Sequence, residues 1–233
     1  MIKVDVIGSG SSGNCYHVTD GETRLLLECG LPWKKIQKAL NFDVHGIEGV
    51  LVSHEHGDHS HGVPGAIRAG LDVYMSAGTA NALGVTGHRV NHVEELEQFK
   101  IGSWRIVPFR LVHDAVEPMG FFLGNRAGEN MLFITDTAYC RPRFAGITHL
   151  MVECNFCEHI LADNVASGRV EKSRLFRLER SHFSIQKVLD FIAANDMRRL
   201  QQVWLMHLSD ANSDAMRFKR EVQALTGVPV EVC

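Results

Sequence analysis

The sequence contains no long apolar run: none approaches the roughly 18 residues that a helix needs to span a membrane, so no membrane partner is expected. Positive charge is not in excess either, since 24 lysines and arginines stand against 27 aspartates and glutamates, for a net charge of −3. This balance excludes a globally basic surface of the kind that drives non-specific nucleic-acid binding. A polyanionic substrate would have to be held locally.

Linkers, low-complexity stretches and short-period repeats are also missing, so residues 1–233 are expected to form a single domain. The N-terminal MIKVDVIGSG begins directly with a strand pattern and shows no signal-peptide features. The chain contains six cysteines, and without a signal peptide these are expected to be reduced thiols in a cytoplasmic protein. The polar segment 163–181 is the expected mobile lid or insertion.

Hydrophobic patterning predicts strands that come in runs, with helices between and after them. The expected strands are residues 2–8, 15–20, 23–28, 49–53, 71–75, 104–109, 119–124, 130–135, 149–153, 202–206 and 229–233. The expected helices are residues 32–42, 63–70, 77–84, 184–195 and 213–225. This order favours a layered α/β domain in which two sheets pack face to face with helices outside.

Histidine is unusually frequent, with 13 copies, and four of them fall in SHEHGDHSHG at residues 53–62. The cluster follows GVLVS, a short apolar run typical of a strand buried on both faces. On a loop leaving that strand, alternate residues point the same way, so His54 and His56 could share one metal ion. Asp58 and His59 would then face a neighbouring position. Imidazole and carboxylate ligands suit Zn²⁺, Mn²⁺ or Fe²⁺; the alternative is a solvated histidine loop.

The motif HEHGDH resembles the H-x-H-x-D-H signature of the metallo-β-lactamase-fold hydrolases, and three later residues match the rest of that pattern. The resemblance implies a four-layer αββα sandwich of two mixed sheets with outer helices. It also implies a centre of two divalent transition-metal ions, Zn²⁺ or Mn²⁺. The first ion would be held by His54, His56 and His113, and the second by Asp58, His59 and His207, with Asp136 bridging. Two such ions activate a water and stabilise a leaving oxygen, and Asp58 could also orient that water.

Within this family, GSGSSGNCY, HDAVEPMGF, ECNFCEHIL and HLSDAN resemble the YycJ-like branch of nuclease-type hydrolases. Glu153 and His182 match a glutamate and a histidine that related tRNase Z and phosphodiesterase enzymes use near the leaving group. A histidine held by a carboxylate stays protonated to higher pH and can donate a proton to an alkoxide. The alternative for His182 is a residue at a helix start, beside the Ser184 cap.

These features favour a phosphodiester substrate, either a nucleic-acid end or a small cyclic nucleotide or phosphate diester. The expected substrate contacts are Ser11, Ser12, Asn14 and Asn155. The Gly/Ser loop that carries the first three could bind phosphate through backbone N–H groups, or could simply connect two strands. Two other functions stay open: hydrolysis of a thioester or other carboxylic ester, and non-catalytic nucleotide binding. The resemblance also allows a homodimer.

The sequence departs from the family pattern at two places. LLLECG puts Glu28 where the family usually has an aspartate that supports the histidine loop, so the surroundings of the ligands could shift. Cys154 takes a small serine position, and Cys157 follows at CxxC spacing. A tetrahedral zinc site needs four ligands, so one CxxC pair is better interpreted as buried thiols.

Overall fold

The computed structural model describes residues 1–233, apart from the side chain of Arg174, and the chain divides into two compact units. Unit 1 comprises Met1–Arg110 and Ala115–Glu129, and unit 2 comprises Leu111–Asp114 and Asn130–Cys233. Over the described residues, no helix combines the length and apolar character needed to cross a membrane.

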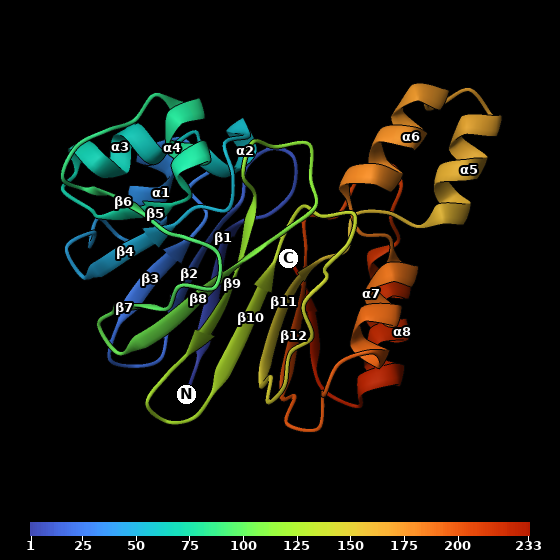
Figure 1. Cartoon of the computed structure of the whole chain (residues 1–233). Helices are drawn as coiled ribbons and strands as arrows, with labels where there is room; N and C mark the ends of the chain where they lie inside the picture. Colours follow the sequence, from blue (N-terminus) through green and yellow to red (C-terminus); the bar gives the residue numbers. More distant parts are fainter. The chain divides into compact units, whose positions relative to one another are not determined.

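Unit 1 contains a six-stranded mixed sheet whose spatial order follows the sequence (Figure 1). Its strands are β1 (Lys3–Gly8), β2 (Cys15–Thr19), β3 (Arg24–Leu27), β4 (Ile47–Leu51), β5 (Val73–Met75) and β6 (Val90–His92). The pairs from β1 to β3 are antiparallel and those from β3 to β6 are parallel. Gly21 has a φ of 98°, which lets it close the Asp20–Gly21 turn between β2 and β3.

Three further strands of unit 1 are antiparallel neighbours: β7 (Phe99–Ile101), β8 (Trp104–Arg110) and β9 (Met119–Gly124). They pack on the six-stranded sheet through aromatic contacts. Phe99 stacks on Tyr74 with ring centroids 5.4 Å apart, and the Trp104 indole N–H donates to the Thr23 carbonyl at 3.3 Å. Ile101 of β7 lies against Gly49 of β4, the strand that leads into the histidine cluster, since a Cβ on Gly49 would lie 2.8 Å from Ile101 Cδ1.

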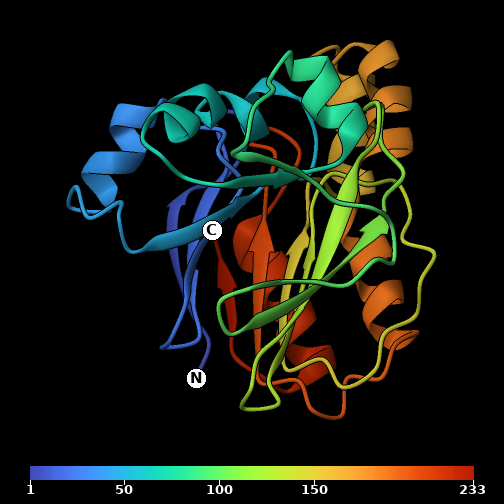
Figure 2. The same cartoon turned by 60° about the vertical axis from the view of Figure 1, so that its left-hand side comes forward.

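Four helices of unit 1 gather on one side of the six-stranded sheet (Figure 2). They are α1 (Trp33–Ala39), α2 (Gly57–Ser60), α3 (Val63–Arg68) and α4 (Ala77–Leu83). The Ser76 hydroxyl caps the start of α4 by accepting from the Thr79 N–H, and Gly84 ends it with a left-handed backbone. Ile36, Val50 and Val63 belong to the buried core that lies between these helices and the sheet.

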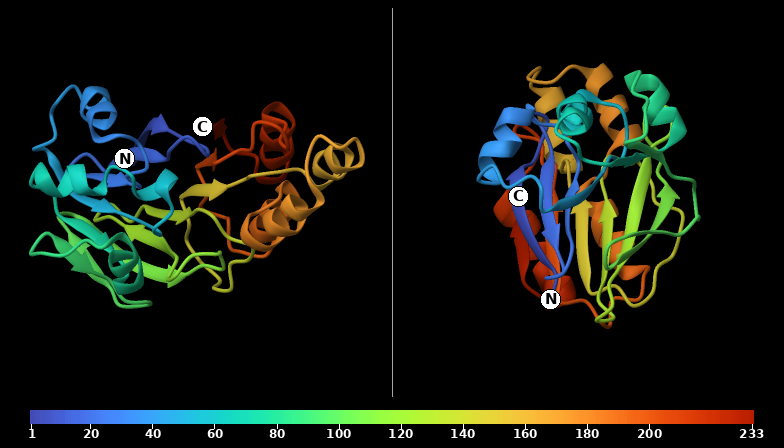
Figure 3. Two further views of the ribbon diagram at one scale, coloured as in Figure 1. Left: turned by 90° about the horizontal axis from the view of Figure 1, so that it is seen from above. Right: turned by 90° about the vertical axis from the view of Figure 1, so that its left-hand side faces the viewer.

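Unit 2 is built on parallel strands with helices alongside. Its strands are β10 (Asn130–Ile134), β11 (His149–Glu153), β12 (Gln202–Met206) and β13 (Val230–Val232). Its helices are α5 (Glu158–Ala166), α6 (Lys172–Ser181), α7 (Ile185–Ala193) and α8 (Ala215–Thr226). The helices α7 and α8 lie side by side along the strands, and α5 lies at the margin of the unit (Figures 1 and 3).

Each expected strand and helix is present, with ends shifted by a few residues, but five elements were not predicted. They are α2, α5, α6, β6 and β7. β6 and β7 are only three residues long, too short for a periodic pattern. The segment 163–181 contains the end of α5 and all of α6, so it has regular structure, and its role as a lid stays a prediction.

Candidate metal centre

His54 and His56 follow β4 in unit 1 and point at each other. His54 Nε2 lies 3.1 Å from His56 Nδ1, and the two rings meet edge to face with centroids 4.7 Å apart. The Ser53 hydroxyl lies 2.8 Å from His54 Nδ1, which fixes the ring and directs Nε2 toward His56. His54 is fully buried. The two nitrogens that face each other can bind one metal ion, as the alternation of the motif predicts.

Asp58 and His59 differ from the expected extended loop, because they lie in the four-residue helix α2. The helical turn rotates His59 back toward His54, and their ring centroids are 4.2 Å apart. His59 Nε2 is 3.5 Å from Asp58 Oδ2. The helical geometry thus brings the imidazoles of His54 and His59 close together, and the assignment of Asp58 and His59 to a neighbouring metal position stays a prediction.

Glu28 lies directly behind this cluster and is fully buried. Its Oε2 accepts from the Ser53 N–H at 3.3 Å, and its Oε1 lies 3.6 Å from His59 Nδ1. Glu28 also has a left-handed backbone with a φ of 65°, which is uncommon outside glycine. The longer side chain in place of the usual aspartate thus still supports the histidine motif from behind.

The Gly/Ser loop is tied to the same motif through Asn14. The buried Asn14 side chain accepts from the Gly10 N–H at 2.9 Å and donates to the Asp58 carbonyl at 3.2 Å. A Cβ on Gly30 would lie 1.7 Å from the Asp58 carbonyl oxygen, so only glycine allows this close approach. Because the polar atoms of Asn14 are engaged within unit 1, its direct effect is to hold the loop against α2.

Ser11 and Ser12, at the tip of this loop, are exposed and border a pocket of about 270 Å³. The other lining residues are Gly30, Pro32, Gly57, Asp58 and His61. The pocket therefore places two hydroxyl-bearing residues beside one of the predicted metal ligands. Its lining thus combines two serines and His61 with the carboxylate of Asp58.

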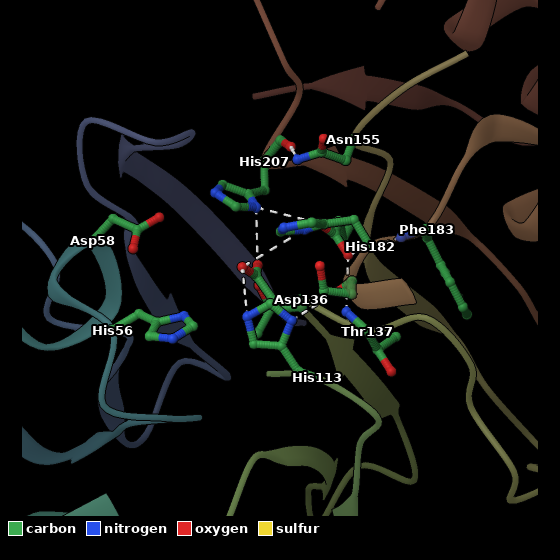
Figure 4. Close-up of polar contacts among 12 residues, drawn as sticks. His56, Asp58, His113, Asp136, Thr137, Asn155, His182, Phe183 and His207 are labelled. Atoms are coloured by element: carbon green, nitrogen blue, oxygen red, sulfur yellow. Dashed lines mark hydrogen bonds and ion pairs between the residues drawn. The ribbon is translucent and has the colours of Figure 1, made fainter. Parts of the chain in front are cut away.

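In unit 2, three histidines converge on the buried Asp136 (Figure 4). Asp136 Oδ1 lies 2.8 Å from His207 Nδ1, and Asp136 Oδ2 lies 3.6 Å from His113 Nε2 and 3.7 Å from His182 Nδ1. The Thr135 hydroxyl donates to Oδ1 at 3.0 Å. Asp136 and His207 follow the ends of the parallel strands β10 and β12, and His182 lies at the C-terminal end of α6.

Glu153, at the end of β11, is fully buried and holds His182. Its Oε1 makes a short hydrogen bond with His182 Nδ1, and its Oε2 accepts from the Thr137 and Phe183 N–H groups at 3.0 and 3.1 Å. Burial alone would lower the pKa of His182, but the Glu153 carboxylate outweighs it and raises that pKa. Burial likewise opposes ionisation of Glu153, yet attraction to His182 lowers the pKa of the carboxyl. Both shifts favour the charged form of the pair.

The helix α6 supports this arrangement at its C-terminal end. The Ser181 carbonyl lies 2.7 Å from His113 Nδ1 and accepts a hydrogen bond from it, so Nε2 is the nitrogen that faces Asp136. Burial lowers the pKa of His113, although Asp136 acts in the opposite direction. A neutral imidazole of fixed tautomer is the form in which histidine binds metal.

Asn155 positions His207 through the backbone of that histidine. Its Nδ2 donates to the His207 carbonyl at 2.9 Å, and His207 has a left-handed backbone with a φ of 54°. The Asn155 side chain is buried, and its Oδ1 has no hydrogen-bond partner among the described residues. A buried acceptor of this kind is costly unless a donor from outside the chain reaches it.

The side chains around Asp136 in unit 2 include donors that fit a divalent metal ion. Ligand atoms of Asp136, Glu153, His182 and His207 all lie within 4.8 Å of one another. Two buried carboxylates so close together need compensating positive charge. Mixed imidazole and carboxylate donors are typical of Zn²⁺ and Mn²⁺ sites.

Several supporting groups belong to the backbone, so residue type does not reveal them. They are the Thr137 and Phe183 N–H groups and the Ser181 carbonyl. The Ser184 hydroxyl does cap a helix, accepting from the Lys187 N–H, but His182 lies outside α7 and bonds to Glu153. The structure thus contains both the expected pairing of His182 with Glu153 and the expected cap.

His149 and the cysteines lie outside the groups of possible metal ligands among the described residues. His149 is buried, lies 2.8 Å from the Thr148 hydroxyl and stacks on Trp204. All six cysteines are free thiols, and Cys154 and Cys157 are buried. Within the described part of the chain, no group of clustered metal-ligand side chains includes a cysteine. The burial of both thiols agrees with the interpretation of the CxxC pair.

The family model described as "Beta-lactamase superfamily domain" matches residues 23–208. Exodeoxyribonuclease WalJ of Streptococcus pneumoniae is 30% identical over 226 residues, which cover 91% of this chain and 83% of that protein. Exodeoxyribonuclease YycJ of Bacillus anthracis is 31% identical over 158 residues, covering 63% of this chain and 58% of that protein.

Among solved structures, the metallo-β-lactamase fold protein YhfI from Bacillus subtilis matches with a TM-score of 0.74 and 16% identity. The match covers 100% of this chain and 97% of that one. The predicted α/β fold with two mixed sheets is confirmed. This fold implies divalent metal ions, and the buried histidine and aspartate cluster fits them.

Proposed function

Because the chain belongs to the β-lactamase superfamily, we propose that it is a two-metal hydrolase that cleaves phosphodiester bonds at the ends of DNA. The observation that carries the proposal is the buried Glu153–His182 pair beside Asp136. Ester hydrolysis with a good leaving group needs no such acid, whereas release of a sugar alkoxide does. The two exodeoxyribonucleases that resemble this chain support DNA as the substrate.

The seven predicted ligands are the side chains that would hold the metal ions, Zn²⁺ or Mn²⁺. They are His54, His56, Asp58, His59, His113, Asp136 and His207. Three observations support this assignment: the convergence of His54 with His56 and His59, the fixed tautomer of His113, and the convergence on Asp136. When bound, two such ions lower the pKa of a water molecule, orient the electrophile and stabilise the leaving oxygen.

The chain's own residues then supply the proton transfers. Asp58, exposed for a quarter of its side chain beside His59, orients the attacking water and accepts its proton. His182, which Glu153 keeps protonated, donates a proton to the leaving 3′ or 5′ oxygen of the sugar. Glu153 itself is a positioning residue, because its contacts are with His182, His207 and two backbone N–H groups.

Substrate contacts belong to the proposal too. Ser11 and Ser12 border the pocket beside Asp58 and donate hydrogen bonds to a phosphate oxygen there. Asn155 Oδ1 accepts a hydrogen bond from the substrate or its water. Asn14 acts indirectly, since its side chain holds the loop that carries the two serines.

A cytoplasmic location also belongs to the proposal, and the free thiols support it. The proposal further includes a homodimer. Measurement of the oligomeric state in solution tests it.

A substrate panel tests the proposal directly. With Mn²⁺ or Zn²⁺, we expect the chain to release nucleotides from linear DNA and to cleave bis-p-nitrophenyl phosphate. Cyclic mononucleotides, cyclic dinucleotides and a thioester are the comparison substrates. Preference for a cyclic nucleotide would rule out DNA as the proposed substrate. Preference for the thioester would rule out phosphodiester hydrolysis as the proposed reaction. Binding of nucleotide without turnover of any substrate would make the chain a binding protein.

A further inference from the structure

The helix α6 (Lys172–Ser181) presents a basic face interrupted by an aromatic side chain, and nothing in the proposed mechanism uses that face. Lys172, Phe176 and Arg180 are exposed and recur at every fourth residue, so they form one stripe along the helix. Phe176 is 53% exposed, which is unusual for so large an apolar ring. Arg177, exposed for 67% of its side chain, borders the stripe on one side, and the exposed Glu179 borders it on the other.

The opposite face of α6 explains why this stripe is held outward. Leu178 is buried and packs with Phe156 and Leu161 in a small core beneath α5, and Leu175 packs against the same core. The helix therefore cannot rotate to bury Phe176 without exposing Leu178. Its orientation is fixed by its own amphipathic pattern.

Local charge sets this region apart from the rest of the chain. Residues 167–183 contain five lysines and arginines and only two glutamates, although the whole chain carries −3. A charged helix face is most often just solvated. A basic stripe with an exposed aromatic between its cations has a more specific use, because single-stranded nucleic acid is bound by cations on its phosphates and by aromatic rings on its bases.

The C-terminal end of α6 is bonded to the proposed catalytic machinery of unit 2. The Ser181 carbonyl accepts from His113 Nδ1, and Arg177 Nε donates to the Asp114 carboxylate at 3.2 Å. His182, the next residue along the chain, bonds to Glu153. A ligand bound along α6 would therefore lie on the element that positions both a metal ligand and the acid.

We propose that the exposed face of α6 binds a single-stranded segment of the DNA substrate, with Phe176 stacked on a base and Lys172 and Arg180 on phosphates. This inference rests on the proposed function and names the element that holds the strand. A single strand is favoured over a duplex because a base must leave its stack to meet the ring. Positive charge concentrated on one helix also explains how an acidic chain holds a polyanion.

The test is binding of a fluorescent phosphorothioate oligo-dT to the metal-loaded protein, measured by anisotropy at several salt concentrations. For Phe176→Ala we expect binding about tenfold weaker, and for Phe176→Trp binding at least as tight as wild type, since the larger ring still stacks. For the double variant Lys172→Ala/Arg180→Ala, the slope of log K against log salt should become less steep by about 1.4. Each phosphate that is no longer neutralised accounts for ~0.7 of this change. Arg220→Ala, an exposed arginine on α8, is the matched control and should change neither quantity.

The outcomes separate this inference from the proposed function. If the wild type cleaves DNA but the α6 variants bind oligo-dT as the wild type does, the strand is held elsewhere and the inference is wrong. A loss in Phe176→Trp as large as in Phe176→Ala would also overturn stacking. If the wild type binds no oligo-dT and cleaves no DNA while hydrolysing small diesters, the DNA part of the proposed function fails as well. The variants are at exposed positions, and their thermal unfolding should match the wild type.

Discussion

Asp136→Ala should abolish cleavage of bis-p-nitrophenyl phosphate, with a loss of about 10³-fold or more in kcat. The expected size of the effect follows from the position of the side chain, because His207, His113 and His182 all face its two oxygens. Removing the carboxylate leaves these imidazoles without their common partner and removes the predicted bridging ligand.

His56→Ala should also lower the rate, because it removes a predicted metal ligand of unit 1, a nitrogen that lies 3.1 Å from His54 Nε2.

Initial rates with saturating Mn²⁺ would measure the effect of Asp136→Ala. Asp163→Ala, which removes an exposed carboxylate on α5 of the same unit, is the matched control and should retain the wild-type rate. Circular dichroism and thermal unfolding would establish that the variant is folded. A folded Asp136→Ala protein with a rate within a few-fold of wild type would rule out the assigned metal centre.

His182→Ala should lower the rate in a way that depends on the leaving group. For DNA, whose leaving alkoxide needs a proton, we expect a loss of about 10²- to 10⁴-fold. For bis-p-nitrophenyl phosphate, whose leaving phenolate is stable, the loss should be less than about tenfold. Equal losses on the two substrates would assign His182 a structural role, because unfolding or displaced ligands would affect both.

The pH profile gives an independent test of His182. Its pKa is raised by Glu153, so the imidazole stays protonated, and able to donate, up to a higher pH than an ordinary histidine. Activity on DNA should therefore fall as the pH rises through this raised pKa. Glu153→Gln removes the negative charge, so the fall should move to lower pH. An alkaline limb that is unchanged in Glu153→Gln would contradict the assignment of His182 as the acid.

Much of the fold could be predicted because its strands carry continuous or alternating apolar patterns. The apolar GVLVS and NMLFIT segments lie in and around β4 and β10, and each leads into predicted ligands. The helices α5 and α6 were not predicted, because their polar sequence around residues 163–181 contains only a few apolar residues such as Leu178. Their amphipathic character becomes clear only when the small core that buries Leu178 is known.

The structure brings predicted side chains of the site into contact, whereas the backbone groups that support them could not be read from the sequence. His182 and Glu153 could be paired from a family pattern, and the structure brings them into contact. The helical turn at α2 could not be foreseen, since GDHS is four residues long and has no periodicity of its own. The same applies to Ser181, whose carbonyl rather than its side chain orients His113.

The metal content of the purified chain tests the central claim most directly. Elemental analysis by mass spectrometry, after removal of loosely bound metal, should find close to two transition-metal ions per chain, and about one or none in Asp136→Ala. Two ions in the wild type, lost together with activity on chelation and regained with Mn²⁺ or Zn²⁺, would agree with a two-metal hydrolase. A fully active wild-type protein with no bound transition metal would contradict it.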